Sequence, residues 1–186
     1  MTPQRPNVES PKSEQRLNPD WIVGFIDGEG CFHVGISRHP EVRFGYQIPP
    51  ELTVVQHQRD IDLLHSLRSA MKCGVVRRNH GDRYCWRVRD LKNLAEVIVP
   101  FFDKFGFLSA KKKRDYSKFK QLVELLVQKQ ERTPEGIRRI LEIRRDMNDG
   151  GNRRYNDEQI LAACRDVSES SETIRQGLPV RPANKI

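Results

Sequence analysis

The residues best suited to chemistry lie in one short segment, WIVGFIDGEG, at positions 21–30. Gly24 and Gly28 are four residues apart among large apolar residues, so on a helix they would form a bare stripe that another helix backbone could approach. Asp27 and Glu29 fall at the C-terminal end of that helix, where the helix dipole already presents partial negative charge. A divalent metal held by the Glu29 carboxylate and a main-chain carbonyl such as that of Gly28 would resolve this conflict. A buried helix with a glycine-rich stop and a solvated acidic loop is the alternative interpretation.

A second group of residues is cationic. Between Lys72 and Lys92, seven Lys and Arg stand against two Asp. Two alternating runs, 75–79 and 83–89, flank a turn at 80–82 and predict a hairpin. The face opposite its apolar residues carries side chains suited to base edges and phosphates, namely Arg77, Asn79, Arg83, Cys85, Arg87 and Arg89. A merely solvated sheet face is the alternative for these arginines.

The elements that must position these residues follow from periodicity and turn signals. A helix is predicted from Asn18 to Gly30, and further helices at 60–71, 91–103, 110–129 and 134–147. Alternation predicts strands over 31–37 and 43–55, the second interrupted at 49–50 by two prolines that cannot donate ladder hydrogen bonds. The order αββαββα predicts an α+β fold of mixed helix and antiparallel β-sheet, with helices backing one face of about four strands.

Composition divides the chain into three parts. Residues 1–16 mix Pro, Ser and charge without periodicity and are expected to form a flexible leader. Residues 17–155 form the expected single domain, and 156–186 form an acidic C-terminal tail that is expected to be partly helical. A formal charge of +8, with 33 Lys and Arg against 25 Asp and Glu, favours a polyanionic partner. The pI is about 9.5.

Several classes of protein are excluded by composition. No apolar run approaches the roughly 20 residues that span a bilayer, so we expect a soluble intracellular protein without a membrane partner, in a bacterial cytoplasm or an organelle. The four cysteines lack the paired spacing of a disulfide framework or a zinc site, and the five histidines are equally scattered. We therefore predict no small-molecule cofactor.

Residues 22–30, IVGFIDGEG, closely resemble the signature of the LAGLIDADG homing endonucleases, and the element order over 17–155 is similar to that family. The resemblance implies a sheet shaped as a DNA-binding saddle and two copies whose signature helices pack together. It implies that the acid at Glu29 binds divalent metal, expected to be Mg2+, and that Asp27 is a structural cap. Because only one signature occurs, the chain resembles the homodimeric branch, with Ile22, Gly24, Phe25 and Gly28 at the dimer interface.

The same resemblance suggests supporting residues. Gln56 matches a family position that organises active-site water, and Lys111 or Lys113 resembles the basic residue that stabilises phosphate charge, although a solvated helix start also explains the lysines. The family's further basic residue would fall at Asp60, whereas the arginine here is Arg59.

The resemblance also extends the predicted DNA surface. The two-hairpin ribbon includes His33, Ser37, Gln47 and Thr53, and phosphate contacts are expected from Arg153 and Arg154. The predicted function is that of a site-specific, metal-dependent double-strand DNA endonuclease acting at a long pseudo-palindromic target. The resemblance to the family implies that it is encoded within an intron. A non-cleaving relative, such as a splicing maturase or a transcription regulator, is the alternative. A His-Asn-His nuclease is disfavoured because Asn79-His80 alone does not supply that metal cluster.

Overall fold

A computed structural model describes residues 17–150 and 154–165 of the chain. Four helices carry most of the helical layer: α1 (Pro19–Glu29), α2 (Ile61–Met71), α5 (Ala110–Val127) and α6 (Pro134–Arg145). Between β6 and α5 the chain forms α3 (Leu91–Asn93), a π-helical turn (Leu94–Ile98) and α4 (Val99–Phe105). The wide turn comes just before Pro100, which has no N–H to donate to the preceding helical turn. The predicted helices are confirmed, apart from this break in 91–103.

The first helix begins where the sequence predicts. The Asn18 side chain accepts a hydrogen bond from the Asp20 N–H at 2.8 Å, and Pro19 occupies the first turn, where its missing N–H has no helical partner. Ile22, Val23 and Ile26 are buried. At the other end, a Cβ on Gly30 would lie 2.7 Å from the Ile26 carbonyl oxygen, so only glycine fits where α1 turns directly into β1.

The main sheet has four antiparallel strands in the order β1-β4-β6-β5. Their bounds are β1 (Gly30–Val34), β4 (Pro50–His57), β5 (Val75–His80) and β6 (Arg83–Val88). A separate two-stranded ribbon pairs β2 (Ser37–Arg38) with β3 (Tyr46–Gln47), so the first predicted hairpin is divided where Pro49 interrupts it. Alternate residues such as Phe32, Val54 and Trp86 are buried on one face of the main sheet.

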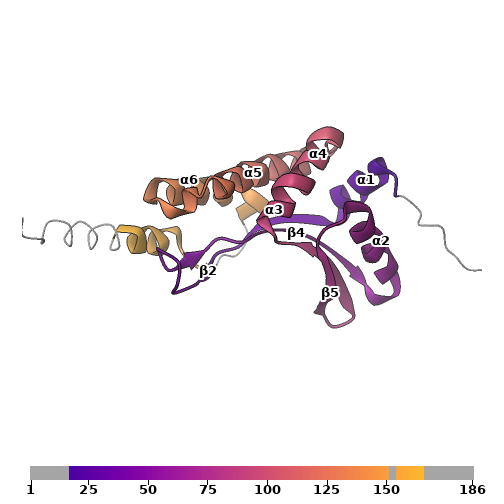
Figure 1. Cartoon of the computed structure of the whole chain (residues 1–186), viewed down its shortest axis with the longest axis horizontal. Helices are drawn as coiled ribbons and strands as arrows, with labels where there is room; N and C mark the ends of the chain where they lie inside the picture. Colours follow the sequence, from indigo (N-terminus) through magenta and orange to yellow (C-terminus); the bar gives the residue numbers. More distant parts are fainter. Residues whose placement is uncertain (1–16, 151–153, 166–186) are drawn as a thin grey trace, which may run out of the picture.

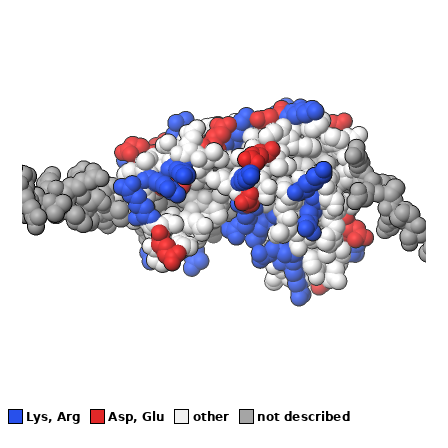
Figure 2. Space-filling model, in the orientation of Figure 1, with Lys and Arg blue, Asp and Glu red and all other residues white. Residues whose placement is uncertain are grey.

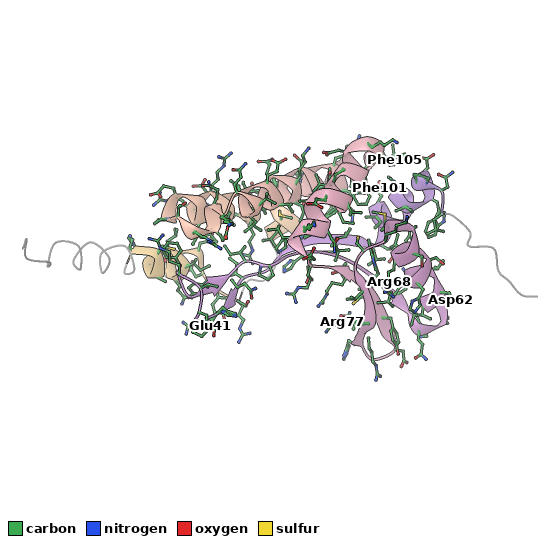
Figure 3. The ribbon with its side chains drawn as sticks, in the orientation of Figure 1. Glu41, Asp62, Arg68, Arg77, Phe101 and Phe105 are labelled. Carbon is green, nitrogen blue, oxygen red and sulfur yellow. The ribbon has the colours of Figure 1, made fainter. Side chains whose placement is uncertain are left out.

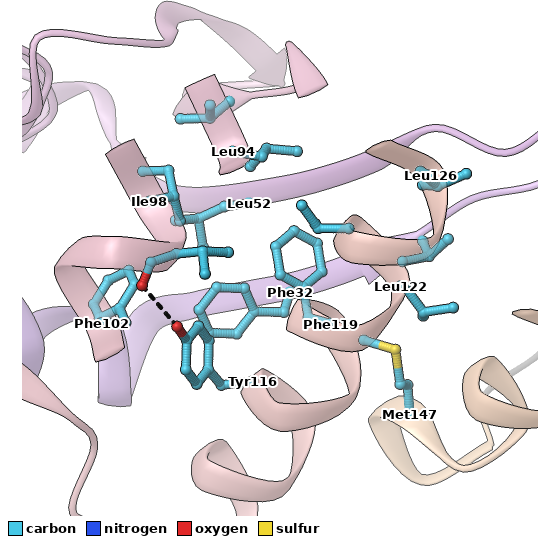
Figure 4. Close-up of a cluster of buried hydrophobic side chains, with 14 of the residues drawn as sticks. Phe32, Leu52, Leu94, Ile98, Phe102, Tyr116, Phe119, Leu122, Leu126 and Met147 are labelled. Atoms are coloured by element: carbon cyan, nitrogen blue, oxygen red, sulfur yellow. Dashed lines mark hydrogen bonds between the residues drawn. The ribbon is translucent and has the colours of Figure 1, made fainter. Parts of the chain in front are cut away.

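Helices cover that buried face, and Figure 1 shows α4, α5 and α6 on one side of β4, with α2 beside β5. Phe32 lies at the centre of the core, with ring centroids 4.9 Å from Phe119, 5.5 Å from Tyr116 and 5.7 Å from Phe107 (Figure 4). Among the described residues no helix covers the opposite face of the strands in Figure 1. The α+β prediction is therefore confirmed, and the sheet has one covered face and one open face.

The outer edge of β1 is closed by side chains from the helical layer. Lys112 Nζ donates to the Gly30 carbonyl, Asn148 Nδ2 donates to the Phe32 carbonyl at 2.9 Å, and Arg144 Nε donates to the Val34 carbonyl at 2.6 Å. An edge strand otherwise presents unpaired carbonyls to solvent or to another chain. These three donors fix β1, and with it the end of α1, against α5, α6 and the turn that follows α6.

The packed part of the chain continues beyond residue 155. Residues 157–165 form a helix whose Ile160 and Cys164 are fully buried in the core. This helix packs on the core beyond the boundary predicted at 155, and the division into a domain over 17–155 and a tail over 156–186 stays a prediction. The predicted leader 1–16 and residues 166–186 lie outside the described residues. No helix among the described residues is long and apolar enough to cross a membrane.

Candidate active site and nucleic-acid interface

The two acids of α1 have different surroundings. The Asp27 carboxylate accepts hydrogen bonds from the Leu108 N–H at 3.2 Å, the Ser109 N–H at 3.0 Å and the Ser109 hydroxyl. Desolvation alone would raise the pKa of Asp27, but the hydrogen bonds from Ser109 and Leu108 outweigh it and hold this pKa below its usual value. Asp27 therefore ties α1 to the start of α5.

Glu29 is the last residue of α1, and its side chain is exposed. Among the residues that the structure describes, no hydrogen bond or ion pair to its carboxylate is found, and the last turn of α1 contains no basic residue. The carboxylate and the helix-end carbonyls thus add negative charge to one exposed point. This arrangement is suited to a bound cation.

Lys112 contacts the residue that follows α1. Its ammonium donates to the Gly30 carbonyl, and burial lowers its pKa despite the opposing effect of Asp27 and Asp115. The predicted residues Lys111 and Lys113 are exposed on the same turn. The sequence could not select among three consecutive lysines, since the choice depends on how α5 is rotated against β1.

Gln56 lies near the end of β4, where it pairs with Tyr84 of β6. The register matches Gly30 with Val54, so Gln56 lies two residues beyond the start of β1, at the end of the sheet where α1 leads into β1. The side chain of Gln56 is half-buried. The structure therefore brings Glu29, Lys112 and Gln56 to one end of the sheet, while Arg59 is exposed and pairs with Asp60 at 3.4 Å.

One side of α1 is bare. A Cβ on Gly24 or Gly28 would meet nothing within 4 Å, and both glycines are exposed. Trp21, 39% exposed, stacks on Phe25 with ring centroids 4.9 Å apart beside this stripe. Ile22, predicted at the dimer interface, is only 2% exposed. That prediction is wrong. Ile22 is two residues before Gly24, and two residues on a helix are about 200° apart around its axis, so Ile22 lies on the side opposite to Gly24.

The open face of the main sheet forms rows of side chains across the strands. One row contains Cys31, Thr53, Arg87 and Val75, and the next contains Val55, Cys85 and Arg77. Among the predicted DNA contacts, several are exposed, namely His33, Ser37, Gln47, Arg77, Asn79, Arg83 and Arg89, whereas Thr53 and Arg87 are half-buried. Figure 3 shows Arg77 on the side of β5 away from α2, and Figure 2 shows Lys and Arg side chains dense over the region of β5.

Cys85 lies on the open face, as alternation predicts, but it is 0% exposed and cannot reach a ligand there, so that prediction is wrong. Its small side chain lies between the longer side chains of Arg77 and Val55 in the same row. Arg153 lies outside the described residues, whereas Arg154 is exposed, with its guanidinium carbon 5.6 Å from the Tyr155 ring centre.

The described residues contain no group of three or more His, Cys, Asp or Glu side chains that could hold a metal ion. One copy thus supplies the Glu29 carboxylate and helix-end carbonyls such as that of Gly28, which are hard oxygen donors. They fit Mg2+, an ion that retains several waters and needs few protein ligands. A full set of ligands would have to include water, phosphate or a second copy.

A basic open sheet face beside an acidic helix end is the arrangement of a nucleic-acid-binding protein with a candidate hydrolytic site. Residues 22–123 match the LAGLIDADG endonuclease family, which is more than half of the chain. The chain belongs to this family.

Named relatives agree with this assignment. Probable intron-encoded endonuclease 2 of Neurospora crassa is 32% identical over 136 residues, covering 72% of this chain and 30% of that protein. The DNA endonuclease I-CvuI of Chlorella vulgaris is 34% identical over 84 residues, covering 44% of this chain and 52% of that protein. The chain therefore spans about half or less of the length of these relatives.

Solved structures share the fold. The homing endonuclease I-TnaI has a TM-score of 0.71 and 42% identity, covering 82% of this chain and 99% of that chain. I-SmaMI bound to an uncleaved DNA target in the presence of calcium ions has a TM-score of 0.71 and 30% identity, covering 79% of this chain and 48% of that chain.

Proposed function

We propose that this protein is a homing endonuclease, encoded within an intron, that cuts both strands of a long pseudo-palindromic DNA site as a homodimer with Mg2+. The observation that carries this proposal is Glu29, an exposed acid at the C-terminal end of a helix whose last turn contains no basic residue. A protein that only binds DNA gains nothing from an acid that faces phosphates and holds no basic side chain, and no such partner of Glu29 is found among the described residues. Its relatives include proteins named as probable intron-encoded endonucleases and a homing endonuclease.

In this proposal Glu29 and the Gly28 carbonyl hold the divalent ion at the scissile phosphate. The ion supplies charge neutralisation and a more acidic water. Lys112, half-buried next to Gly30, keeps a positive charge near the same phosphate. Gln56, at the end of β4, offers an amide that can orient water. Each copy places these residues against one strand.

The bare side of α1 supports the homodimer. Gly24 and Gly28 have open space where a Cβ would be, so a second α1 can approach at backbone distance. Helix α4 packs on α1 and ends at Phe105, which is 37% exposed (Figure 3). Leu108, three residues further on, is 88% exposed. In addition, I-SmaMI, which was solved with DNA, is about twice as long as the part this chain covers, as expected if one active unit needs two such folds.

The open sheet face supports DNA as the substrate. Arginine forks can bind guanine edges bidentately and can also contact phosphates. The ribbon of β2 and β3 extends the same surface with Ser37 and Gln47, which pair with the register Ser37↔Gln47. A surface this long can follow a major groove over one half of a palindromic site.

The test is cleavage of a plasmid carrying the intron-lacking allele of the host gene, with Mg2+ and with EDTA. We expect wild type to linearise the plasmid only with the metal. Glu29→Gln should bind the same DNA but cleave it at least about 100-fold more slowly, because it loses an anionic metal ligand. The matched control is Glu142→Gln, which removes an exposed acid of α6. Full cleavage by Glu29→Gln would overturn the proposal.

A further inference from the structure

Glu51 is the only carboxylate in the four strands of the main sheet. It pairs with His33 of β1 and is two residues from Thr53 on the same strand. Its side chain therefore lies on the open face, among the predicted DNA contacts. The register Leu52↔Val88 places Arg89 directly across from it, just beyond β6. An acid at this position faces the polyanion that the basic surface would bind, which weakens binding unless the acid has a specific role.

Two arginines hold the Glu51 carboxylate. Its Oε2 lies 3.2 Å from Arg89 Nε and 3.6 Å from Arg87 Nε. The side chain of Glu51 is 17% exposed and that of Arg87 is 19% exposed, so this pair is largely shielded from solvent, whereas that of Arg89 is 50% exposed. Thr53 Oγ1 donates to the other Glu51 oxygen at 3.4 Å, which restrains the carboxylate from its second side.

The guanidinium groups of Arg87 and Arg89 thus face Glu51 with the edge that carries Nε. Each forms an ion pair with Glu51 in which Nε is the nearest nitrogen, and Arg87 Nε is buried with no hydrogen-bond partner among the described residues, so Glu51 supplies its nearest negative charge. A guanidinium carries five N–H donors in a rigid fork, so contact through Nε leaves the Nη donors for another ligand. Fixing two long side chains before binding removes the conformational entropy that they would otherwise lose in the complex.

We propose that Glu51 is a positioning residue for base recognition, which aligns Arg87 and Arg89 so that their Nη donors read guanine edges at adjacent positions of each DNA half-site. This inference rests on the proposed function. Glu51 reduces general attraction to phosphate while it sharpens the choice of base. Removing its charge therefore has two effects of opposite sign, which loss of a simple structural contact would not produce.

The experiment compares wild type with Glu51→Gln in Ca2+, using two probes. One is a pool of randomised duplexes, sequenced after selection for binding, and the other is a shuffled duplex of fixed composition. In Glu51→Gln we expect the ratio of the preferred base to the other bases in the selected pool to fall about tenfold, at one or two adjacent positions per half-site. Its affinity for the shuffled duplex should rise severalfold at low salt, because one negative charge leaves the interface.

Three variants distinguish the effect of the Glu51 charge from its effect on the positions of the two arginines. Glu51→Asp keeps the charge but shortens the reach, so it should relax the base preference without tighter binding to the shuffled duplex. Glu142→Gln, on the helical side of the sheet, should change neither readout. In the double variant Arg87→Gln/Arg89→Gln, the further change Glu51→Gln should no longer alter base preference, because the residues that it positions are absent.

The inference is overturned if Glu51→Gln keeps the wild-type base preference, or if it weakens binding to selected and shuffled duplexes equally. It is also overturned if Glu51→Gln still changes base preference in the double variant. Circular dichroism verifies that each variant is folded. If wild type itself selects no sequence from the pool, then the proposed function has failed, which is a different result from failure of Glu51 alone.

Discussion

At the scale of single residues, two acids only two positions apart on α1 have opposite surroundings. Asp27 accepts hydrogen bonds from the Leu108–Ser109 segment, whereas Glu29 is exposed at the end of the helix. One acid is therefore committed to holding α5, and the other is available to a ligand. Replacing Asp27 by its amide should therefore lower stability, and replacing Glu29 by its amide should lower activity.

Asp27→Asn should destabilise the fold at neutral pH by about 1–2 kcal/mol, because an amide presents one acceptor oxygen where the carboxylate presents two. The folded pKa of Asp27 lies below its ordinary value of 3.8, so its contribution to stability is complete above that value. That contribution disappears as the pH falls through the lower folded pKa. Urea denaturation at pH 7 and pH 3 measures this. A destabilisation that is equal at both values would contradict the assignment.

Lys112→Met should reduce cleavage about 100-fold, because a positive charge beside the reacting phosphate is lost. Burial lowers the Lys112 pKa, so wild-type activity should decline at alkaline pH as this ammonium loses its proton, and Lys112→Arg should move that decline to higher pH. Single-turnover rates from pH 7 to 10 test both effects. The matched control is Lys92→Met, at an exposed position of α3, which should change the rate less than about tenfold. A larger loss there than in Lys112→Met would refute the role of Lys112.

At the scale of elements, β1 connects the helical layer to the candidate site. Its outward carbonyls are bound by Lys112, Asn148 and Arg144. Asn148 has a positive φ of 51°, a conformation that Asn and Gly adopt more readily than other residues. Asn148 therefore combines a backbone requirement with a side-chain hydrogen bond.

Two substitutions separate these contributions of Asn148. Asn148→Gly keeps the left-handed backbone but loses the hydrogen bond to the Phe32 carbonyl, at an expected cost of about 1 kcal/mol. Asn148→Ala loses the bond and adds backbone strain, so it should cost about 1 kcal/mol more. Equilibrium urea unfolding gives both free energies. If the alanine variant is as stable as the glycine variant, the positive φ is not a constraint on this position.

Elements were predictable from the sequence where a pattern repeats along one segment. The alternation of 83–89 and the spacing of 60–71 gave β6 and α2, since a half-buried strand and an amphipathic helix each impose a period on their residues. Alternation assigned Cys85 to the correct face but could not show its burial, which depends on neighbours in two other strands. The contact of Lys112 with Gly30 joins residues 82 apart, and no local pattern encodes it.

At the scale of the whole molecule, the protein has two surfaces with different physical demands. The open sheet face is cationic and requires positioned donors, whereas the bare side of α1 requires small residues and close contact. Within one copy, Gly24 in the interior of α1 lowers the stability of the helix, because glycine destabilises a helix by about 1 kcal/mol relative to alanine, whereas Gly28 lies in the last turn. In the proposed homodimer, close contact between two α1 helices offsets this cost.

This reasoning predicts effects of opposite sign from one substitution. Gly24→Ala should stabilise the isolated chain by about 1 kcal/mol, since the new Cβ meets no atom within 4 Å and alanine favours the helix. The same Cβ should hold two α1 helices apart, weaken the dimer at least about tenfold and reduce cleavage at low protein concentration. Sedimentation equilibrium and thermal melts over a range of concentrations measure the two effects.

Ala70→Gly, at an exposed position of α2, is the control for helix propensity and should destabilise the chain without changing dimerisation. A Gly24→Ala protein that dimerises as tightly as wild type would show that α1 is not the contact between copies.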